Sequence, residues 1–133
     1  MARLILDTGV LVAGARGRRL EVPASGDDVA LPALVIAEYL AGTMLDTDPG
    51  RAAAQRAFLD EVLQVLPILD YDEGVAEHHA ALLAHTRRLG EPRGAHDLVV
   101  AATARSADRT VVTTDERAGF GELPGVDVRV VRP

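Results

Sequence analysis

The stretch Arg3-Leu4-Ile5-Leu6-Asp7 decides the fold of this chain, because it joins a short apolar run directly to a carboxylate. Residues 3–6 predict a buried strand, followed by a turn and a helix. Asp7 then has two interpretations. It can be an ordinary N-cap, which typically contributes about 1 kcal/mol, or it can be a ligand-binding residue at the carboxyl end of a strand.

Three further acids lie against apolar segments in the same way. Glu38 interrupts residues 34–41, Asp97 opens the run 98–102, and Asp115 closes the run 111–114. An ionised carboxylate near a core costs several kcal/mol unless something pairs with it. Taken singly, Asp97 can be a helix cap and Asp115 a turn residue, whereas Glu38 has no comparable alternative. Together with Asp7, these acids predict one site assembled by the fold.

The remaining pattern predicts short apolar strands that alternate with helices. Strands are expected at 29–31, 65–69, 110–114 and 126–131, and Pro67 makes the second of these an edge strand. Helices are expected from Pro32 to about Ala41 with Gly42 ending the first, and at 52–64, 72–89 and 97–106. This alternation predicts an α/β fold, a central mostly parallel sheet with helices on both faces.

Length and composition narrow the class of protein. The 133 residues predict one domain, 1–133, with a Leu, Val and Ala core. The chain has no run of about 18 apolar residues, so we expect no membrane span. The absence of cysteine is compatible with a reducing cytoplasm, where we place the protein. Lysine is also absent, which excludes a Schiff-base or P-loop lysine.

Carboxylates without cysteine suit a hard cation, Mg²⁺ with Mn²⁺ as a substitute. Such an ion lowers the pKa of a bound water and neutralises phosphoryl oxygens, so phosphodiester hydrolysis is the favoured chemistry. The net charge of −6 does not exclude a nucleic-acid substrate, because four clustered acids leave −6 + 4 = −2 elsewhere. His96 precedes Asp97, and its role stays open between a surface side chain and a donor to phosphate.

Four segments together resemble the PIN-domain ribonucleases, specifically the VapC toxins of bacterial toxin–antitoxin pairs. They are residues 6–11 (LDTGVL), 36–42 (IAEYLAG), 96–104 (HDLVVAATA) and 112–115 (VTTD), and residues 120–126 (FGELPGV) are similar to the family's ending. Their order and spacing cover essentially the whole chain.

The resemblance implies a PIN-like three-layer sandwich and a metal-dependent endoribonuclease that cuts tRNA or ribosomal RNA and inhibits translation. It implies that Asp7 and Asp97 bind the metal most directly, that Glu38 and Asp115 complete the catalytic set, and that Thr113 or Thr114 adds a hydroxyl contact. It also implies a homodimer neutralised by a VapB-like antitoxin.

The chain departs from the family pattern at two places. Gly9 replaces a frequent small hydroxyl residue, and the segment before Phe120 lacks an acid, which leaves Glu116 as the nearest substitute. The second departure leaves open whether one or two ions bind.

Two alternatives remain, a housekeeping PIN nuclease of RNA processing and a catalytically inactive PIN-like interaction module. A haloacid-dehalogenase phosphatase would need an aspartate at position 9, and a receiver domain would need a lysine.

Overall fold

The computed structural model describes residues 1–132 and contains one five-stranded, all-parallel sheet in the order β3-β2-β1-β4-β5. Its strands are β1 (Arg3–Leu6), β2 (Asp28–Pro32), β3 (Ile68–Leu69), β4 (Thr110–Thr113) and β5 (Val128–Val130). The helices are α1 (Thr8–Ala15), α2 (Ala33–Leu45), α3 (Pro49–Val65), α4 (Glu73–Leu89) and α5 (Ala95–Ala107), with short 3₁₀ turns η1 (Glu116–Ala118) and η2 (Phe120–Glu122).

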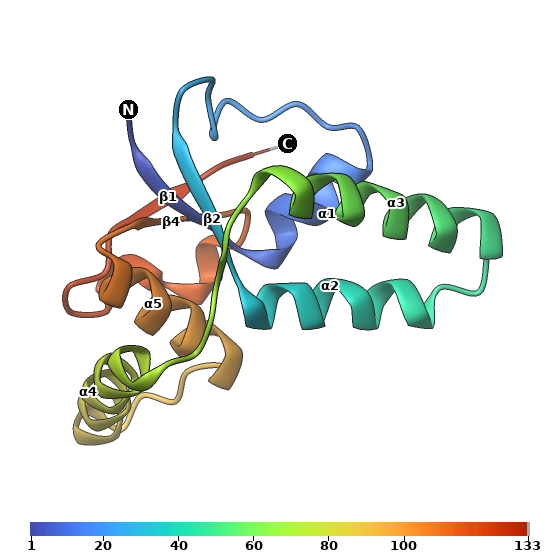
Figure 1. Cartoon of the computed structure of the whole chain (residues 1–133). Coiled ribbons are helices and arrows are strands. Elements are labelled where there is room, and N and C mark those ends of the chain that lie inside the picture. Colours follow the sequence, from blue (N-terminus) through green and yellow to red (C-terminus); the bar gives the residue numbers. More distant parts are fainter. Residues whose placement is uncertain (133) are drawn as a thin grey trace.

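The strand order determines where the helices lie. From β1 the chain first moves to β2 and β3 on one side, and only later to β4 and β5 on the other. Since parallel crossovers are right-handed, the outward path puts α1, α2 and α3 on one face and the return path puts α4 and α5 on the opposite face. In Figure 1, α4 and α5 lie together on one side of the sheet. The predicted α/β fold with a parallel sheet and flanking helices is confirmed.

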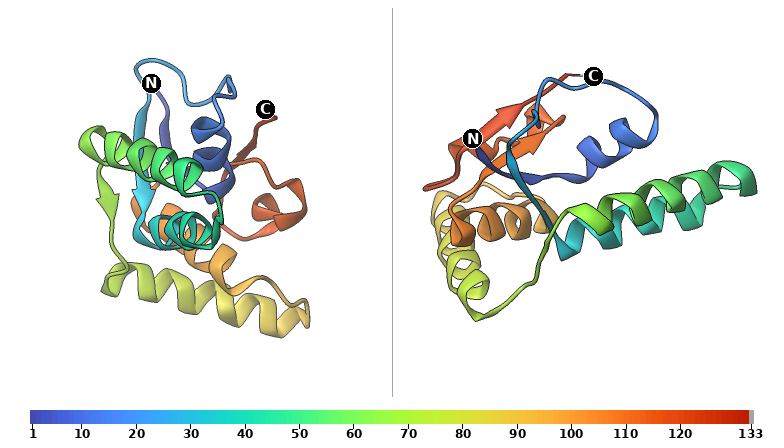
Figure 2. Two further views of the ribbon diagram at one scale, coloured as in Figure 1. Left: turned by 90° about the vertical axis from the view of Figure 1, so that its right-hand side faces the viewer. Right: turned by 45° about the horizontal axis from the view of Figure 1, so that its top comes forward.

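The hydrophobic core lies between the sheet and the inner helices. Leu4, Ile5, Val111 and Val112 of the two central strands are fully buried. Helix α5 buries six of its residues, and the outer helix α4 packs along it. Figure 2 shows α2 and α3 as a long hairpin that projects away from the sheet.

Several element boundaries differ from the sequence prediction by a few residues, and two of the differences are informative. Gly42 does not end its helix, since α2 continues to Leu45 and Asp46 follows as the C-cap. An interior glycine costs only about 1 kcal/mol relative to alanine, which the neighbouring turns offset. Val65 belongs to α3 rather than to the edge strand, which keeps only Ile68–Leu69.

Other helix ends have clear local causes. Pro32 directly precedes α2 as its N-cap, and Gly90 ends α4 with φ of 64° in the left-handed region. Asp72 begins α4 by accepting a hydrogen bond from the Val75 amide at 2.9 Å. Within residues 1–132, no helix is both long and apolar enough to cross a membrane.

Candidate active site

The strand order reverses between β1 and β4, and two of the four predicted acids lie at that point. Asp7 directly follows β1, and Asp115 follows β4 after one intervening residue. Crevices at the carboxyl ends of strands, where the order reverses, are the usual binding sites of open α/β sheets. Helix α2 packs against both α1 and α5, and α1 and α5 each pack against β4 (Figure 1), so side chains of all three helices reach this region.

Thr113 holds the two strand-end acids in place. Its hydroxyl donates to Asp7 Oδ2 at 2.9 Å and accepts the Asp115 backbone amide at 3.0 Å. The other oxygen of Asp7 accepts the Thr8 amide at 2.8 Å, so Asp7 is also the N-cap of α1. Because Thr113 is completely buried, this hydroxyl fixes the carboxylate of Asp7 from within the protein.

Glu38 joins the site from the second turn of α2. Its Oε1 accepts the Thr8 hydroxyl at 3.0 Å, and its Oε2 lies 3.1 Å from His96 Nδ1. The sequence predicted that a charge on this helix needs a polar partner, and the structure provides two. His96 therefore contacts a site carboxylate, which sequence reasoning left open.

Asp97 lies in the first turn of α5, four residues after Arg93. One guanidinium nitrogen of Arg93 donates to the carbonyls of Ala118 and Gly119 at 2.8 and 2.9 Å, and the other pairs with Glu122 at 2.7 Å. These bonds tie the segment before α5 to the turns that follow Asp115. No local sequence pattern identifies this clamp, because its partners lie 25 to 29 residues from Arg93 in the chain.

The site carries uncompensated negative charge. Burial raises the pKa of Asp7, and repulsion from Glu38 and Asp115 adds to it, while hydrogen bonds from Thr113 and Thr8 oppose the shift. Burial also raises the pKa of Asp97, with repulsion from Asp7, Asp115 and Glu38. Within residues 1–132, no arginine forms an ion pair with any of these four acids.

The donors suit a divalent cation in their chemistry. They are carboxylate oxygens, and a bound cation would relieve the mutual repulsion that adds to the effect of burial on the pKa of Asp7 and of Asp97. Across residues 1–132, however, no three acidic or histidine side chains are arranged to hold one ion together. Mg²⁺ retains several waters and commonly uses only one or two carboxylates, so the set fits an ion that keeps its waters.

Glu116 does not join the four acids. Its carboxylate is largely exposed and lies 3.3 Å from Arg132, and it does not contribute to the raised pKa of either Asp7 or Asp97. The expectation that it could replace the missing acid before Phe120 gains no support from this position.

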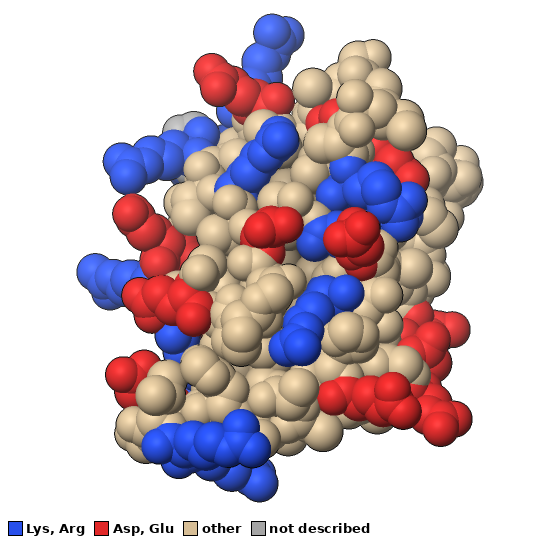
Figure 3. Space-filling view, turned by 90° about the vertical axis from the view of Figure 1, so that its left-hand side faces the viewer, with Lys and Arg blue, Asp and Glu red and all other residues tan. Residues whose placement is uncertain are grey.

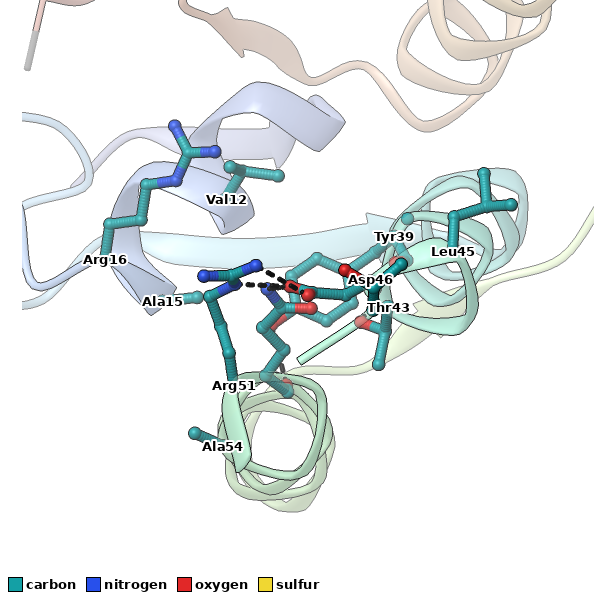
Figure 4. A pocket seen from close by; sticks show the side chains of 12 residues that line it. Val12, Ala15, Arg16, Tyr39, Thr43, Leu45, Asp46, Arg51 and Ala54 are labelled. Atoms are coloured by element: carbon teal, nitrogen blue, oxygen red, sulfur yellow. Dashed lines mark hydrogen bonds and ion pairs between the residues drawn. The ribbon is translucent and has the colours of Figure 1, made fainter. Parts of the chain in front are cut away.

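A separate pocket of about 840 Å³ lies between α1, α2 and α3. Figure 4 shows Asp46 and Arg51 joined across it, with Tyr39 on one wall and Arg16 at its rim. Arg51 donates to both oxygens of Asp46, at 2.6 and 2.8 Å, and holds the pKa of Asp46 below its ordinary value. None of the four site acids lines this pocket.

Comparison with known proteins identifies the class. Residues 4–125 match the PIN domain family. Ribonuclease VapC5 of Mycobacterium tuberculosis is 30% identical over 131 residues, covering 96% of this chain and 93% of the relative. The tRNA(fMet)-specific endonuclease VapC of Salmonella typhimurium is 28% identical, covering 75% of this chain and 73% of that protein.

Solved structures agree with this fold. The VapBC-5 complex of M. tuberculosis matches with a TM-score of 0.79 and 27% identity over the whole of both chains. VapBC2 of Rickettsia felis, bound to a promoter DNA fragment, matches with a TM-score of 0.84 and 21% identity, covering 96% and 98% of the two chains, which shows the fold alone. The chain thus belongs to the PIN-domain family, in its VapC group.

Proposed function

We propose that this chain is a metal-dependent endoribonuclease toxin. Its proposed catalytic residues are Asp7, Glu38, Asp97 and Asp115. The observation that carries the proposal is the convergence of these acids at the reversal of strand order, with no arginine paired to them within residues 1–132. A site that stabilised only the fold would have its carboxylates neutralised by the protein itself. The names of both curated relatives, ribonuclease and endonuclease, support the reaction class.

Asp7 and Asp97 are the proposed metal ligands, and Mg²⁺ is the proposed ion, with Mn²⁺ as a substitute. When bound, such an ion lowers the pKa of a water and neutralises charge on phosphoryl oxygens. Thr113 presents Asp7 in a fixed orientation. Glu38 and Asp115 are proposed to hold the attacking water and accept its proton, and the hydrogen bond from Thr8 keeps Glu38 directed into the site.

The proposed substrate is structured RNA, either tRNA or ribosomal RNA, whose cleavage inhibits translation. Support comes from the Salmonella relative, which is named a tRNA(fMet)-specific endonuclease. On the face shown in Figure 3, basic and acidic side chains are interspersed, so that face carries no field of a single sign. Recognition is therefore expected to rest on local arginine contacts and RNA shape rather than on overall charge.

A VapB-like antitoxin is the proposed protein partner, since several structural neighbours are VapBC complexes. We propose that it covers the pocket between α1, α2 and α3. Leu45 lines this pocket and is 81% exposed, so it is available to a partner. Leu45→Glu should weaken capture of the product of an adjacent short gene, whereas Leu89→Glu on α4 should not.

The remaining parts of the proposal are a homodimer and a cytoplasmic location. Analytical ultracentrifugation of the purified chain tests the dimer directly. A neighbouring short gene for a DNA-binding protein distinguishes the toxin from a housekeeping PIN nuclease. Cleavage itself distinguishes both from a catalytically inactive interaction module.

The decisive experiment expresses the wild type and Asp97→Asn in a bacterial host and sequences the new RNA 5′ ends. Discrete ends that appear only with wild type support the nuclease and identify its substrate. Purified wild type should then cut that RNA with added Mg²⁺ and stop when EDTA is present. Equal cutting by Asp97→Asn would show that the site assignment is wrong.

A further inference from the structure

The two threonines before Asp115 have different surroundings. Thr113 is completely buried, donates its only hydroxyl hydrogen to Asp7 and accepts the Asp115 amide. Thr114 is half-buried, and its hydroxyl has no hydrogen-bond partner within residues 1–132. It lines a hollow together with Asp115, Glu116 and Arg117. Thr113 is therefore occupied in building the site, whereas the Thr114 hydroxyl is available to a ligand.

Gly9 shows where the Thr114 hydroxyl lies. A Cβ atom built on Gly9 would collide with Thr114 Oγ1, yet it would stand 3.5 Å from Thr114 Cβ, an ordinary contact distance. The conflict thus involves the hydroxyl oxygen alone. Gly9 follows Asp7 and Thr8 at the start of α1. The Thr114 hydroxyl therefore occupies the space that a side chain at position 9 would fill, two residues after Asp7 in the chain.

We propose that Thr114 is a substrate-binding residue whose hydroxyl donates a hydrogen bond to a non-bridging oxygen of an RNA phosphate, and that Gly9 is glycine to make room for it. This inference rests on the proposed nuclease function and names a contact of the same site. A hydroxyl suits this task because it can approach an anionic oxygen without adding charge to a site already crowded with carboxylates.

Single variants test the hydroxyl. Thr114→Val keeps the branched shape and removes the donor, so kcat/KM for RNA cleavage should fall by about 10- to 100-fold, the range expected for a hydrogen bond to a charged group. Thr114→Ser should stay close to wild type, which a packing role would not explain. Thr47→Val, an exposed threonine outside the site, is the matched control and should leave cleavage unchanged.

Two double variants test whether a hydroxyl placed at position 9 can replace that of Thr114. Gly9→Ser alone should be destabilised and weakly active because of the collision with Thr114. Gly9→Ser combined with Thr114→Ala removes the collision and restores a hydroxyl, so activity should recover above that of Thr114→Ala. Gly9→Ala with Thr114→Ala has the same packing without the hydroxyl, and it should fold well but stay impaired.

Binding gives a readout that does not depend on cleavage. In the Asp97→Asn background, Thr114→Val should weaken binding of a fluorescent RNA hairpin by about 10-fold or more. Unchanged binding and cleavage in Thr114→Val would overturn the inference while leaving the nuclease proposal intact. A wild-type protein that neither binds nor cuts RNA would overturn both.

Discussion

The two ends of the parallel sheet hold their carboxylates in opposite ways. At the amino ends of the strands, Asp28 lies 3.0 Å from Arg109 and 3.4 Å from Arg3. Arg109 is nearly buried, and it also donates to the carbonyls of Leu4 and Asp28. Asp27 accepts the backbone amides of Ala2 and Ala24. This end therefore neutralises its acids with groups of the protein and connects β1, β2 and β4.

At the carboxyl ends the acids have weaker partners. Asp7 has a hydroxyl and a backbone amide, and Glu38 has a hydroxyl and an imidazole. Burial raises the pKa of Asp7 and of Asp97 there, and repulsion among the acids adds to this effect. The comparison indicates that one end of the sheet serves stability, while the other retains a charge that a bound cation would neutralise.

The largest expected difference between the two ends is in activity. Asp7→Asn should lower RNA cleavage by about 1,000-fold or more, equivalent to roughly 4 kcal/mol of transition-state stabilisation, because it removes a proposed metal ligand. Asparagine can still cap α1, so the fold should persist. Asp28→Asn at the amino end should leave the activity of the folded protein close to wild type. Single-turnover cleavage with both purified variants measures the contrast, and equal losses would contradict it.

The next largest effect should be on stability, at the amino end. Arg109→Met leaves two backbone carbonyls and the Asp28 carboxylate with fewer partners, so the free energy of unfolding should fall by about 2–4 kcal/mol. Urea unfolding measures it. Arg18→Met, at an exposed position, is the control and should change stability by less than about 0.5 kcal/mol. A similar result for both variants would show that the buried guanidinium does not stabilise the sheet.

Arg93 allows a smaller test at the carboxyl end. Arg93→Met removes the bonds to Ala118 and Gly119 and frees the segment before Asp97 relative to Asp115. We expect kcat to fall by about 10-fold, because displaced carboxylates hold the reacting groups less accurately. Arg87→Met, on the exposed end of α4, is the matched control. Normal kcat in Arg93→Met would mean that the clamp does not position the site.

The smallest expected effect distinguishes the two ends by their pH dependence. The pKa of Asp7 in the folded state is raised above its ordinary value of 3.8. Between these two pKa values the folded state binds more protons than the unfolded state. The contribution of Asp7 to the free energy of unfolding therefore falls as pH rises from the ordinary value to the raised one. Asp7→Asn should therefore be more stable than wild type near pH 7 and equal to it below about pH 3.8.

Asp27 should behave in the opposite way. Amides of Ala24 and Ala2 lower its pKa, so its contribution to stability is present above the ordinary value and is lost as pH falls through its lower folded pKa. Asp27→Asn should destabilise the protein near pH 7 and lose this effect in strong acid. Urea midpoints of both variants across pH provide the test. Urea midpoints that change in the same direction near pH 7 in Asp7→Asn and Asp27→Asn would contradict the difference between the two ends of the sheet.

The four candidate acids could be proposed from the sequence because each lies directly beside an apolar segment. Glu38 stands in an apolar helix, and Asp7 ends an apolar strand, so burial of their neighbours forces a carboxylate toward the core. The strand and helix types followed from the same apolar runs. The end of α2 was less predictable, because a single interior glycine weakens a helix too little to mark where it stops.

The sequence by itself determined the alternation of strands and helices, the family and which acids form the candidate site, since apolar periodicity and charge are local properties. Only the tertiary structure decided the partners. In the folded chain Arg93 donates to the carbonyl of Ala118, and Arg109 pairs with Asp28. The hydroxyl of Thr113 is bound to Asp7, whereas that of Thr114 is available. These contacts join residues far apart in the chain, and their geometry depends on how the strands are ordered and how the helices pack.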